Sequence, residues 1–249
     1  MSQSHYDVDN PYQQDSFGSR MFGSVELSPE RMALVKGTYG YLALSVIMAV
    51  AGAYFGANSP AVLGLFSSPI AFLVAMAVLW ITQSVALAMR HNPVLGVIAL
   101  LADGFLSGLI LGPIIYFACV MTGSPDIVIN ALVITGLVFA GVTAMVWTSG
   151  KRYSAPRGLM GGLLFAGLGL IVLSFLMPGD LTSPIGLALT GIIGVIGVMT
   201  LVYGTSNVLH DPTIDSPITG AVILFAGLFN VFVAVLRILL TIASLSSND

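Results

Sequence analysis

Charged residues are scarce in this chain of 249 residues: they make up 8% of it, whereas apolar residues make up 57%. Soluble domains carry about 25% charged residues, so the composition excludes an ordinary soluble fold. The basic residues number only eight and the net charge is −3, which leaves nucleic-acid binding without support. A single cysteine, Cys119, excludes a disulfide within the chain.

Motifs of catalysis are missing as well. The sequence contains no HExxH, no GxSxG and no phosphate-binding loop. The three histidines, His5, His91 and His210, lie outside the long apolar runs, so no membrane-embedded histidine is available to activate a serine. We therefore predict a protein that is not an enzyme and that has no cofactor.

Metal binding is the one chemical function for which the histidines remain candidates. His210 stands beside Asp211 and close to Asp215, and these residue types can ligate a metal ion. A short run of polar residues between two apolar runs is also typical of a solvated loop. The sequence favours the loop, and we predict no metal site.

Seven apolar runs are long enough to cross a membrane, because a spanning helix needs about 20 apolar residues. They cover residues 37–56, 69–89, 93–120, 127–148, 158–177, 184–208 and 217–243. None of them shows the polar alternation of a membrane β-barrel strand. We predict an all-α, polytopic membrane protein of seven transmembrane helices, with the lipid bilayer as its partner.

The basic residues outside these runs all fall on one side of the predicted membrane. They lie before the first run or in the connections after the second and fourth runs: Arg20, Arg31, Lys36, Arg90, Lys151, Arg152 and Arg157. The other three loops, 57–68, 121–126 and 178–183, contain no lysine or arginine. By the positive-inside rule, we expect a cytoplasmic N-terminus and a C-terminus outside.

The first thirty residues differ from the rest of the chain. Residues 1–30 are polar and contain no apolar stretch of the length that a secretory signal needs. We expect them to form a flexible cytoplasmic arm. Because the connections between the apolar runs are short, residues 31–249 are predicted to form a single membrane domain.

Glycines recur at helical spacing in two of the predicted helices. Gly104, Gly108 and Gly112 are spaced by four residues in the third run, which puts them on one face that another helix can approach closely. Packing within the chain is the favoured interpretation, and a dimer face is the alternative. The sixth run has a similar series, Gly191, Gly194 and Gly197.

Only two charged residues interrupt the apolar runs, Asp103 and Arg237. A charge at the centre of a membrane costs about 2.5–3.5 kcal/mol on insertion scales. Asp103 lies ~15 Å from the inner end of its helix, where it either bonds to a neighbouring helix in its neutral form or belongs to an ion or proton path. Arg237 lies ~30 Å from the inner end and is expected to extend to the outer interface. The difference in depth argues against a direct ion pair.

A family resemblance rests on the order of several short motifs. They are Tyr203-Gly204-Thr205-Ser206-Asn207, Leu224-Phe225-Ala226-Gly227-Leu228-Phe229-Asn230-Val231-Phe232, Leu236-Arg237-Ile238-Leu239, Gly96, Ser107-Gly108, Leu111-Gly112-Pro113-Ile114-Ile115 and the basic residue Arg90. Over about residues 31–245, the chain resembles the bacterial branch of the Bax inhibitor (transmembrane Bax inhibitor motif) family. Thr205-Ser206-Asn207 and the third-helix segment are most similar to enterobacterial members that modulate the FtsH membrane protease.

The resemblance implies a bundle in which the seventh helix is central. It also implies, for the members that conduct calcium, a pH sensor made of two aspartates with a basic residue nearby. In this chain the two aspartate positions are Gly204 and Gly227, while the basic residue, Arg90, is present. Glycine cannot titrate, so the family's sensor is not expected here. Asp103 shares the predicted depth of Gly227, which suggests the hypothesis that it replaces the lost carboxylate.

Two functions follow from these features. The first is a non-enzymatic regulator in the bacterial cytoplasmic membrane that binds a membrane-bound ATP-dependent protease. The alternative is a weak calcium or proton leak. Calcium prefers several oxygen ligands, and the candidate path offers a single carboxylate with a few polar side chains: Asp103, Arg90, Thr205, Ser206, Asn207 and Asn230.

Overall fold

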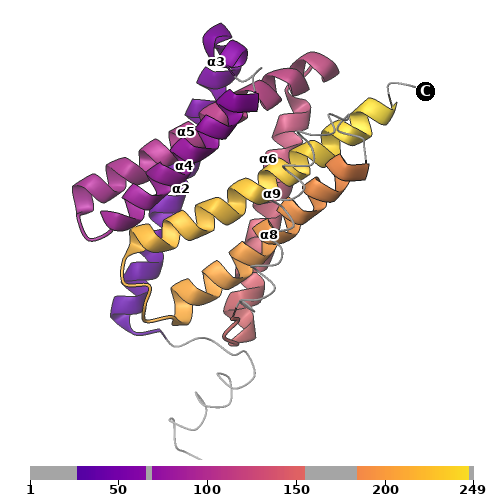
Figure 1. Cartoon of the computed structure of the whole chain (residues 1–249). Coiled ribbons are helices and arrows are strands. Elements are labelled where there is room, and N and C mark those ends of the chain that lie inside the picture. The colour runs from indigo at the N-terminus through magenta and orange to yellow at the C-terminus, as the bar shows by residue number, and fades with distance from the viewer. Residues whose placement is uncertain (1–26, 66–68, 155–183, 247–249) are drawn as a thin grey trace, which may run out of the picture.

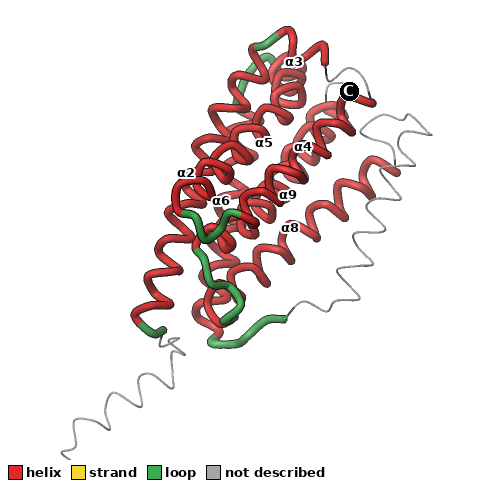
Figure 2. Tube along the Cα trace, turned by 60° about the vertical axis from the view of Figure 1, so that its left-hand side comes forward, coloured by secondary structure: helices red, strands yellow, loops and turns green. Residues whose placement is uncertain are grey.

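The computed structural model describes residues 27–65, 69–154 and 184–246, and all regular structure in them is helical (Figures 1 and 2). The helices are α2 (Pro29–Asn58), α3 (Pro60–Leu65), α4 (Pro69–Ala88), α5 (Pro93–Thr122), α6 (Asp126–Ser149), α8 (Pro184–His210) and α9 (Pro217–Ser246). The predicted all-α membrane architecture is confirmed. Five of the helices, α2, α5, α6, α8 and α9, are long and apolar enough to cross a membrane, and α4 has a shorter apolar stretch, Ala77–Ala88.

Six of the seven predicted spans fall on these helices. The remaining span, 158–177, lies outside the described residues. The total of seven spans and the sides of the two termini therefore stay predictions.

Proline begins most of the helices. The first residue is a proline in α2, α3, α4, α5, α8 and α9. The missing N–H of proline costs nothing at this position, and its fixed φ suits the first helical turn. The side chain of Asn92 caps α5 by accepting hydrogen bonds from the N–H groups of Val94 and Leu95. Gly123 and Gly150, with φ of 67° and 60°, end α5 and α6 in the left-handed conformation.

The boundary predicted for the N-terminal arm is wrong by two residues. Pro29 and Glu30 belong to α2 and not to the arm 1–30. The side chain of Ser28 accepts a hydrogen bond from the N–H of Arg31 and so caps the helix one residue before Pro29. Residues 1–26 of the predicted arm lie outside the described residues.

Helices α2 and α5 run parallel and approach each other through the predicted glycine face. The Cβ direction of Gly104 points to the backbone of Ser45, that of Gly108 to the backbone of Ala49, and that of Gly112 to the backbone of Gly56. No side chain separates the two helices at these levels. The glycine face of α5 is therefore used for packing within the chain.

Helices α8 and α9 form a second close pair, which runs antiparallel. The facing residues along the pair are Gly194 with Ala234, Gly197 with Val231, Leu201 with Gly227, Gly204 with Leu224, and Val208 with Gly220. At each level at least one of the two residues is small, so the helices can approach closely. Gly191, which the sequence grouped with Gly194 and Gly197, has no atom of the described residues within 4 Å of its Cβ position. Six residues after Gly191 the helix has turned by about 600°, so Gly191 and Gly197 lie on different faces.

Helix α9 joins the two pairs. It contacts α8 and α6 on one side and α2, α4 and α5 on the other (Figure 1), and it has buried residues along its length from Ile218 to Thr241. This is the position that the resemblance implies for the last helix. The arrangement places the buried face of α9 at the centre of the described bundle.

We expect Gly108→Ala to destabilise the protein by about 1–3 kcal/mol, because the added methyl group would meet the backbone of Ala49 and Ala53 on α2. Gly141→Ala on α6 is the matched control, since none of the residues that the structure describes comes within 4 Å of that Cβ position. An alanine there is expected to be neutral or to stabilise the helix by up to about 1 kcal/mol. Unfolding in mixed micelles, followed by circular dichroism, gives both values. Equal stabilities for the two variants would contradict the close α2–α5 approach.

Candidate functional site

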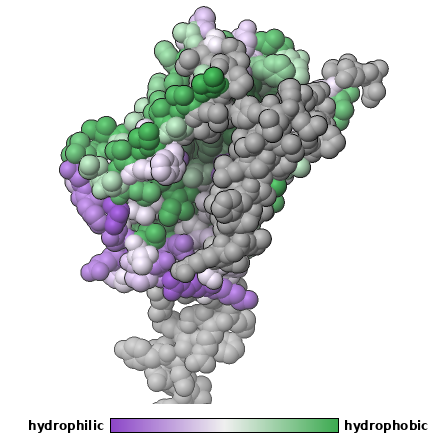
Figure 3. Space-filling model, viewed as in Figure 1, coloured by the Kyte–Doolittle hydropathy of each residue, from purple (hydrophilic) through white to green (hydrophobic). Residues whose placement is uncertain are grey.

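Charged and polar side chains gather at one end of the molecule (Figure 3, purple, lower end). We call this region the polar end and define it by three arginines and two aspartates that come from four different segments: Arg31, Arg90, Arg152, Asp211 and Asp215. It corresponds to the side that the positive-inside rule predicts to be cytoplasmic. The loop between α8 and α9 carries both aspartates and lies at its centre.

Arg31, in the first turn of α2, binds the end of α8. Its guanidinium group donates hydrogen bonds to four backbone carbonyl oxygens: those of Asn207 at 2.6 Å, Leu209 at 3.2 Å, Asp211 at 2.7 Å and Ile214 at 2.8 Å. Asn207 and Leu209 belong to the last turn of α8, where a positive charge is favourable, and Asp211 and Ile214 belong to the loop that follows it. Arg31 therefore fixes the start of α2 to the α8–α9 loop.

From the sequence, Arg31 was only a marker of topology, and its role at the end of α8 was not predicted. The four carbonyls lie between 176 and 183 residues away in the chain. Backbone carbonyls have no side-chain signature that a sequence could reveal. No local pattern around Arg31 could have indicated its partners.

Arg90 pairs with Asp215, and its Nε lies 3.4 Å from Oδ1 of the carboxylate. His91 approaches the same carboxylate at 3.6 Å. The hydroxyl of Ser216 donates a hydrogen bond of 2.8 Å to the carbonyl oxygen of Arg90. Exposed ion pairs contribute only about 0–1 kcal/mol to the stability of a fold. The main effect of these contacts is therefore to position the α4–α5 turn against the α8–α9 loop.

Asp211 has a different set of partners. The backbone N–H and the hydroxyl of Thr213 donate hydrogen bonds to its Oδ1, at 2.9 and 2.8 Å. These two bonds, with smaller contributions from Arg152 and Arg31, hold the pKa of the Asp211 carboxyl below its usual value. Such a carboxyl stabilises the loop at pH values above its unfolded pKa, and the contribution is lost as the pH falls through the lowered pKa.

The three residues that were considered as metal ligands have separate partners. The ring Nδ1 of His210 lies 3.0 Å from the carbonyl oxygen of Ser206, Asp211 is bound by Thr213, and Asp215 lies against Arg90. Among the described residues, no group of three histidine, cysteine or acidic side chains is placed to hold a metal ion.

Asp103 is fully buried between α4 and α5. Its Oδ1 accepts a hydrogen bond of 2.9 Å from the hydroxyl of Thr82 on α4, and the side chain of Gln83 lies close to the same carboxyl group. Its Oδ2 has no hydrogen-bond partner in the described part of the chain. An ionised carboxylate with one unpaired buried oxygen would be costly, so this site suits a bound proton or a cation.

The candidate polar path does not form one cluster. Asp103 bonds to α4, whereas the hydroxyl of Ser206 on α8 accepts a hydrogen bond of 2.8 Å from the N–H of Tyr153. Asn207 contributes its carbonyl oxygen to Arg31. The other three members have no described bond to one another: Thr205 is buried with no hydroxyl partner among the described residues, Asn230 borders Gly197, and Arg90 pairs with Asp215.

The two glycines at the family's aspartate positions lie in the α8–α9 interface. The Cβ direction of Gly204 meets the side chains of Ile223 and Leu224, and that of Gly227 meets Leu201. A carboxylate at either position would displace apolar side chains. Asp103 shares the predicted depth of Gly227 but faces α4, so it does not fill the place of the missing carboxylate.

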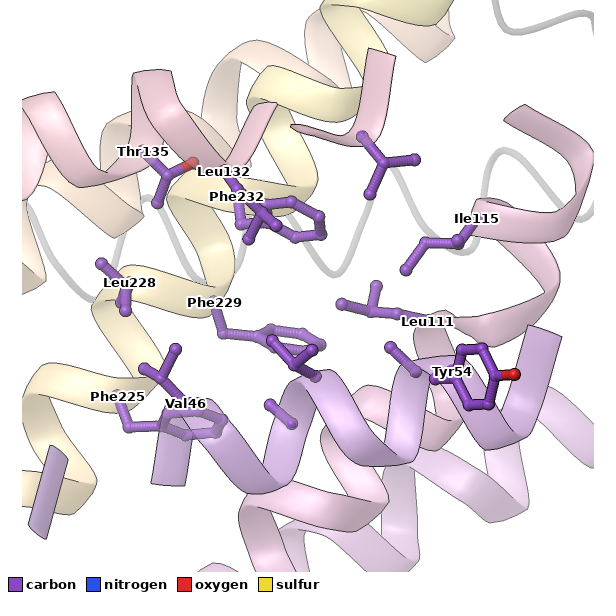
Figure 4. Close-up of a pocket in the computed structure, with 14 residues that line it drawn as sticks. Val46, Tyr54, Leu111, Ile115, Leu132, Thr135, Phe225, Leu228, Phe229 and Phe232 are labelled. Atoms are coloured by element: carbon purple, nitrogen blue, oxygen red, sulfur yellow. The ribbon is translucent and has the colours of Figure 1, made fainter. Parts of the chain in front are cut away.

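An apolar groove opens between α2 and α6, with α9 as its floor and α5 at one end (Figure 4). Three phenylalanines of α9 line it, Phe225, Phe229 and Phe232, and the cavity holds about 240 Å³. Val46 and Tyr54 border it on α2, and Leu132 and Thr135 border it on α6. The hydroxyl of Thr135 donates a hydrogen bond to the carbonyl oxygen of Ala131 in its own helix. The groove therefore suits an apolar occupant.

Comparison with known proteins covers nearly the whole described bundle. The family model described as "Inhibitor of apoptosis-promoting Bax1" matches residues 31–244. An uncharacterized protein of Campylobacter jejuni is 27% identical over 236 residues, which are 92% of this chain and 96% of that protein. An uncharacterized protein of Helicobacter pylori strain J99 is 31% identical over 219 residues, 87% of this chain and 90% of that protein.

One relative has a name that describes an activity. The Escherichia coli K12 protein "Modulator of FtsH protease YccA" is 33% identical over 150 residues. The match covers 59% of this chain and 65% of that protein. The similarity to this relative thus covers only part of the chain, while the family match extends from the first turn of α2 to the last turns of α9.

We expect Arg31→Ala to lower the free energy of unfolding by about 1–3 kcal/mol, because hydrogen bonds from a charged donor are stronger than neutral ones. The free energy of unfolding of Arg31→Lys should lie between those of the wild type and Arg31→Ala, since an ammonium group cannot reach all four carbonyls. Lys36→Ala, which removes an exposed charge of the same helix, is the control. Hydrogen–deuterium exchange should rise at residues 207–214 in Arg31→Ala alone. Unchanged exchange there would show that Arg31 does not hold the α8–α9 loop.

Proposed function

The chain belongs to the Bax inhibitor family, and from this premise we propose that it is a non-enzymatic regulator of a membrane-bound ATP-dependent protease. The E. coli relative named as a modulator of FtsH protease gives the class of partner. A second E. coli relative, of the same identity and coverage, is named an inner membrane protein. This supports the bacterial inner membrane as the location of the proposed activity.

The observation that carries the proposal is the apolar packing between α8 and α9. Gly204 and Gly227, at the positions of the aspartate pair, lie against Ile223, Leu224 and Leu201. Neither position offers a titratable group, so the interface suits a rigid joint better than a pH-operated gate. A role through binding is favoured over a role through gated conduction.

The groove between α2 and α6 offers a surface for such binding. Its lining is apolar and its floor is the central helix α9. Membrane helices associate through close packing, because lipid supplies no hydrophobic driving force between them. A transmembrane helix of the protease that filled the groove would bury the exposed side chains of Tyr54 and Leu132.

We expect the full chain to be captured in detergent by the purified FtsH-type protease of the same membrane. Deletion of residues 2–26 keeps the Ser28 cap and α2, so it tests the arm without disturbing the bundle, and it should weaken capture if the protease grips the arm. Leu132→Trp should weaken capture about tenfold, or 1.4 kcal/mol, by filling the groove. Val195→Trp on α8 is the control, because Val195 is similarly exposed and lies outside the groove.

Failure of the full chain to bind the protease would overturn the proposal. Capture that is reduced equally by Leu132→Trp and by Val195→Trp would exclude the groove as the binding surface. Capture that survives the deletion of residues 2–26 would show that the protease does not grip the N-terminal arm. Each variant thus tests a different part of the proposal.

A second candidate function, a weak calcium or proton leak, is favoured by Asp103 alone. The carboxyl is buried on a spanning helix, is held by Thr82 and has one oxygen without a hydrogen bond among the described residues. An ionised carboxylate would attract a cation, and a protonated one would not. A leak through this site would therefore grow as the pH rises.

For this second function, Asp103→Asn is expected to abolish the pH dependence of calcium flux into proteoliposomes. The amide keeps the size of the side chain but cannot titrate. Thr82→Val, which removes the hydroxyl and leaves the carboxyl, should shift the pH profile without flattening it. The assay contains no protease, so its result is independent of the capture experiment. A flux that has the same pH profile in the wild type and in Asp103→Asn would rule out Asp103 as the titrating group.

A further inference from the structure

Arg237 is a positive charge on α9 that has no counter-ion in the described part of the chain. None of the ion pairs among the described residues includes it, and they all lie at the polar end. Its Nε is buried and makes no hydrogen bond there. The residue as a whole is partly exposed, so its guanidinium group is open to an anion from outside the chain. No described residue supplies that anion, and partial removal of a charge from water makes such a partner favourable.

The side chain of Arg237 lines a cavity between α5 and α9. The cavity holds about 180 Å³, and Pro113, Ile114, Phe117 and Leu240 complete its lining. This is several times the volume of about 30 Å³ that one water molecule takes up in the liquid. Apart from Arg237, the residues that line it are apolar.

A second cavity lies nearer to the ends of the two helices. It holds about 310 Å³ and is lined by Met121, Thr122, Ala243 and Ser246. Along α5 and α9, these residues lie three to six positions beyond Phe117 and Leu240, in the direction away from the polar end. We call the line of the two cavities along α5 and α9 the seam; its polar side chains lie near the helix ends and its cation lies further in.

The depth of Arg237 matches the boundary of the membrane. It stands twenty residues after Pro217, where α9 leaves the polar end, so it lies ~30 Å along the helix. The hydrocarbon core of a bilayer is about 30 Å thick. Arg237 therefore lies near the outer boundary of the hydrocarbon core, where a long arginine side chain can reach the lipid phosphates of the leaflet farther from the polar end.

We propose that Arg237 binds the phosphate of an anionic phospholipid of that leaflet, in the seam between α5 and α9. The planar guanidinium group binds phosphate oxygens through two parallel hydrogen bonds. The polar headgroup lies toward Thr122 and Ser246, and an acyl chain follows the apolar side chains of Ile114 and Leu240. A lipid supplies both the negative charge and the apolar contact that the seam requires, whereas free phosphate supplies only the charge.

The test measures the thermal unfolding of the purified chain in detergent with three additives. They are dioleoylphosphatidylglycerol, dioleoylglycerol, which has the same chains and no phosphate, and inorganic phosphate. We expect phosphatidylglycerol alone to raise Tm of the wild type, by about 4–8 °C near saturation. Arg237→Gln should lose this shift, and Arg237→Lys should keep part of it. Lys36→Gln, which removes an exposed charge at the polar end, should respond like the wild type.

Several results would overturn the proposal. An equal response to dioleoylglycerol would show that the phosphate is not recognised, and an equal response to inorganic phosphate would show that no lipid is needed. The same holds if Arg237→Gln responds like the wild type, or if Lys36→Gln loses the shift as well. Phe117→Trp keeps all charges and narrows the seam, so it should also reduce the shift. It tests the proposal even if Arg237→Gln does not fold.

Discussion

The fold depends on how closely helix backbones approach one another at small residues. In a membrane, the apolar side chains of a helix gain little by leaving lipid, so van der Waals packing has to hold the helices together. Glycines of α5 face the backbone of α2, and small residues alternate along α8 and α9 at intervals of three or four. These two contacts bring α9 into the centre, where it can touch every other long helix of the described bundle.

The close packing also explains why the polar contacts lie where they do. Because α8 and α9 are antiparallel and tightly paired, the loop that joins them is held at the end of the bundle. Three basic residues from three other segments, Arg31, Arg90 and Arg152, converge on this loop. Arg31 contributes most, since it binds four carbonyl oxygens, while the other two form exposed ion pairs. The loop is thus the point at which the start of α2, the α4–α5 turn and the end of α6 are joined.

The sequence was sufficient to predict those features of the structure that depend on a single helix. Helix ends could be predicted because apolar runs stop at prolines and caps, and the face of Gly104, Gly108 and Gly112 because their spacing equals about one helical turn. The register of α8 against α9 could not be predicted, since it depends on which small residue faces which large one. Gly191 and Gly197 were grouped although they lie on different faces of α8, because residues close in sequence or depth need not share a face. Ser206 and Asp103 bond to different segments although both lie on membrane helices.

Of the two charged residues within the apolar helices, Asp103 stood out in the sequence, but Arg237 is the one whose surroundings in the structure call for an explanation. Asp103 stood out as the departure from the family pattern, yet it has a partner on α4 and its neutral form needs no counter-ion. Arg237 fits the family pattern and was expected only to extend toward the interface, but an arginine cannot be neutralised by losing its proton. Its Nε lies buried beside an apolar seam, and none of the described ion pairs includes it. A buried acid can become neutral by holding a proton, whereas the partly buried guanidinium group keeps its charge and is stabilised by an anion, so Arg237 says more about what surrounds the protein.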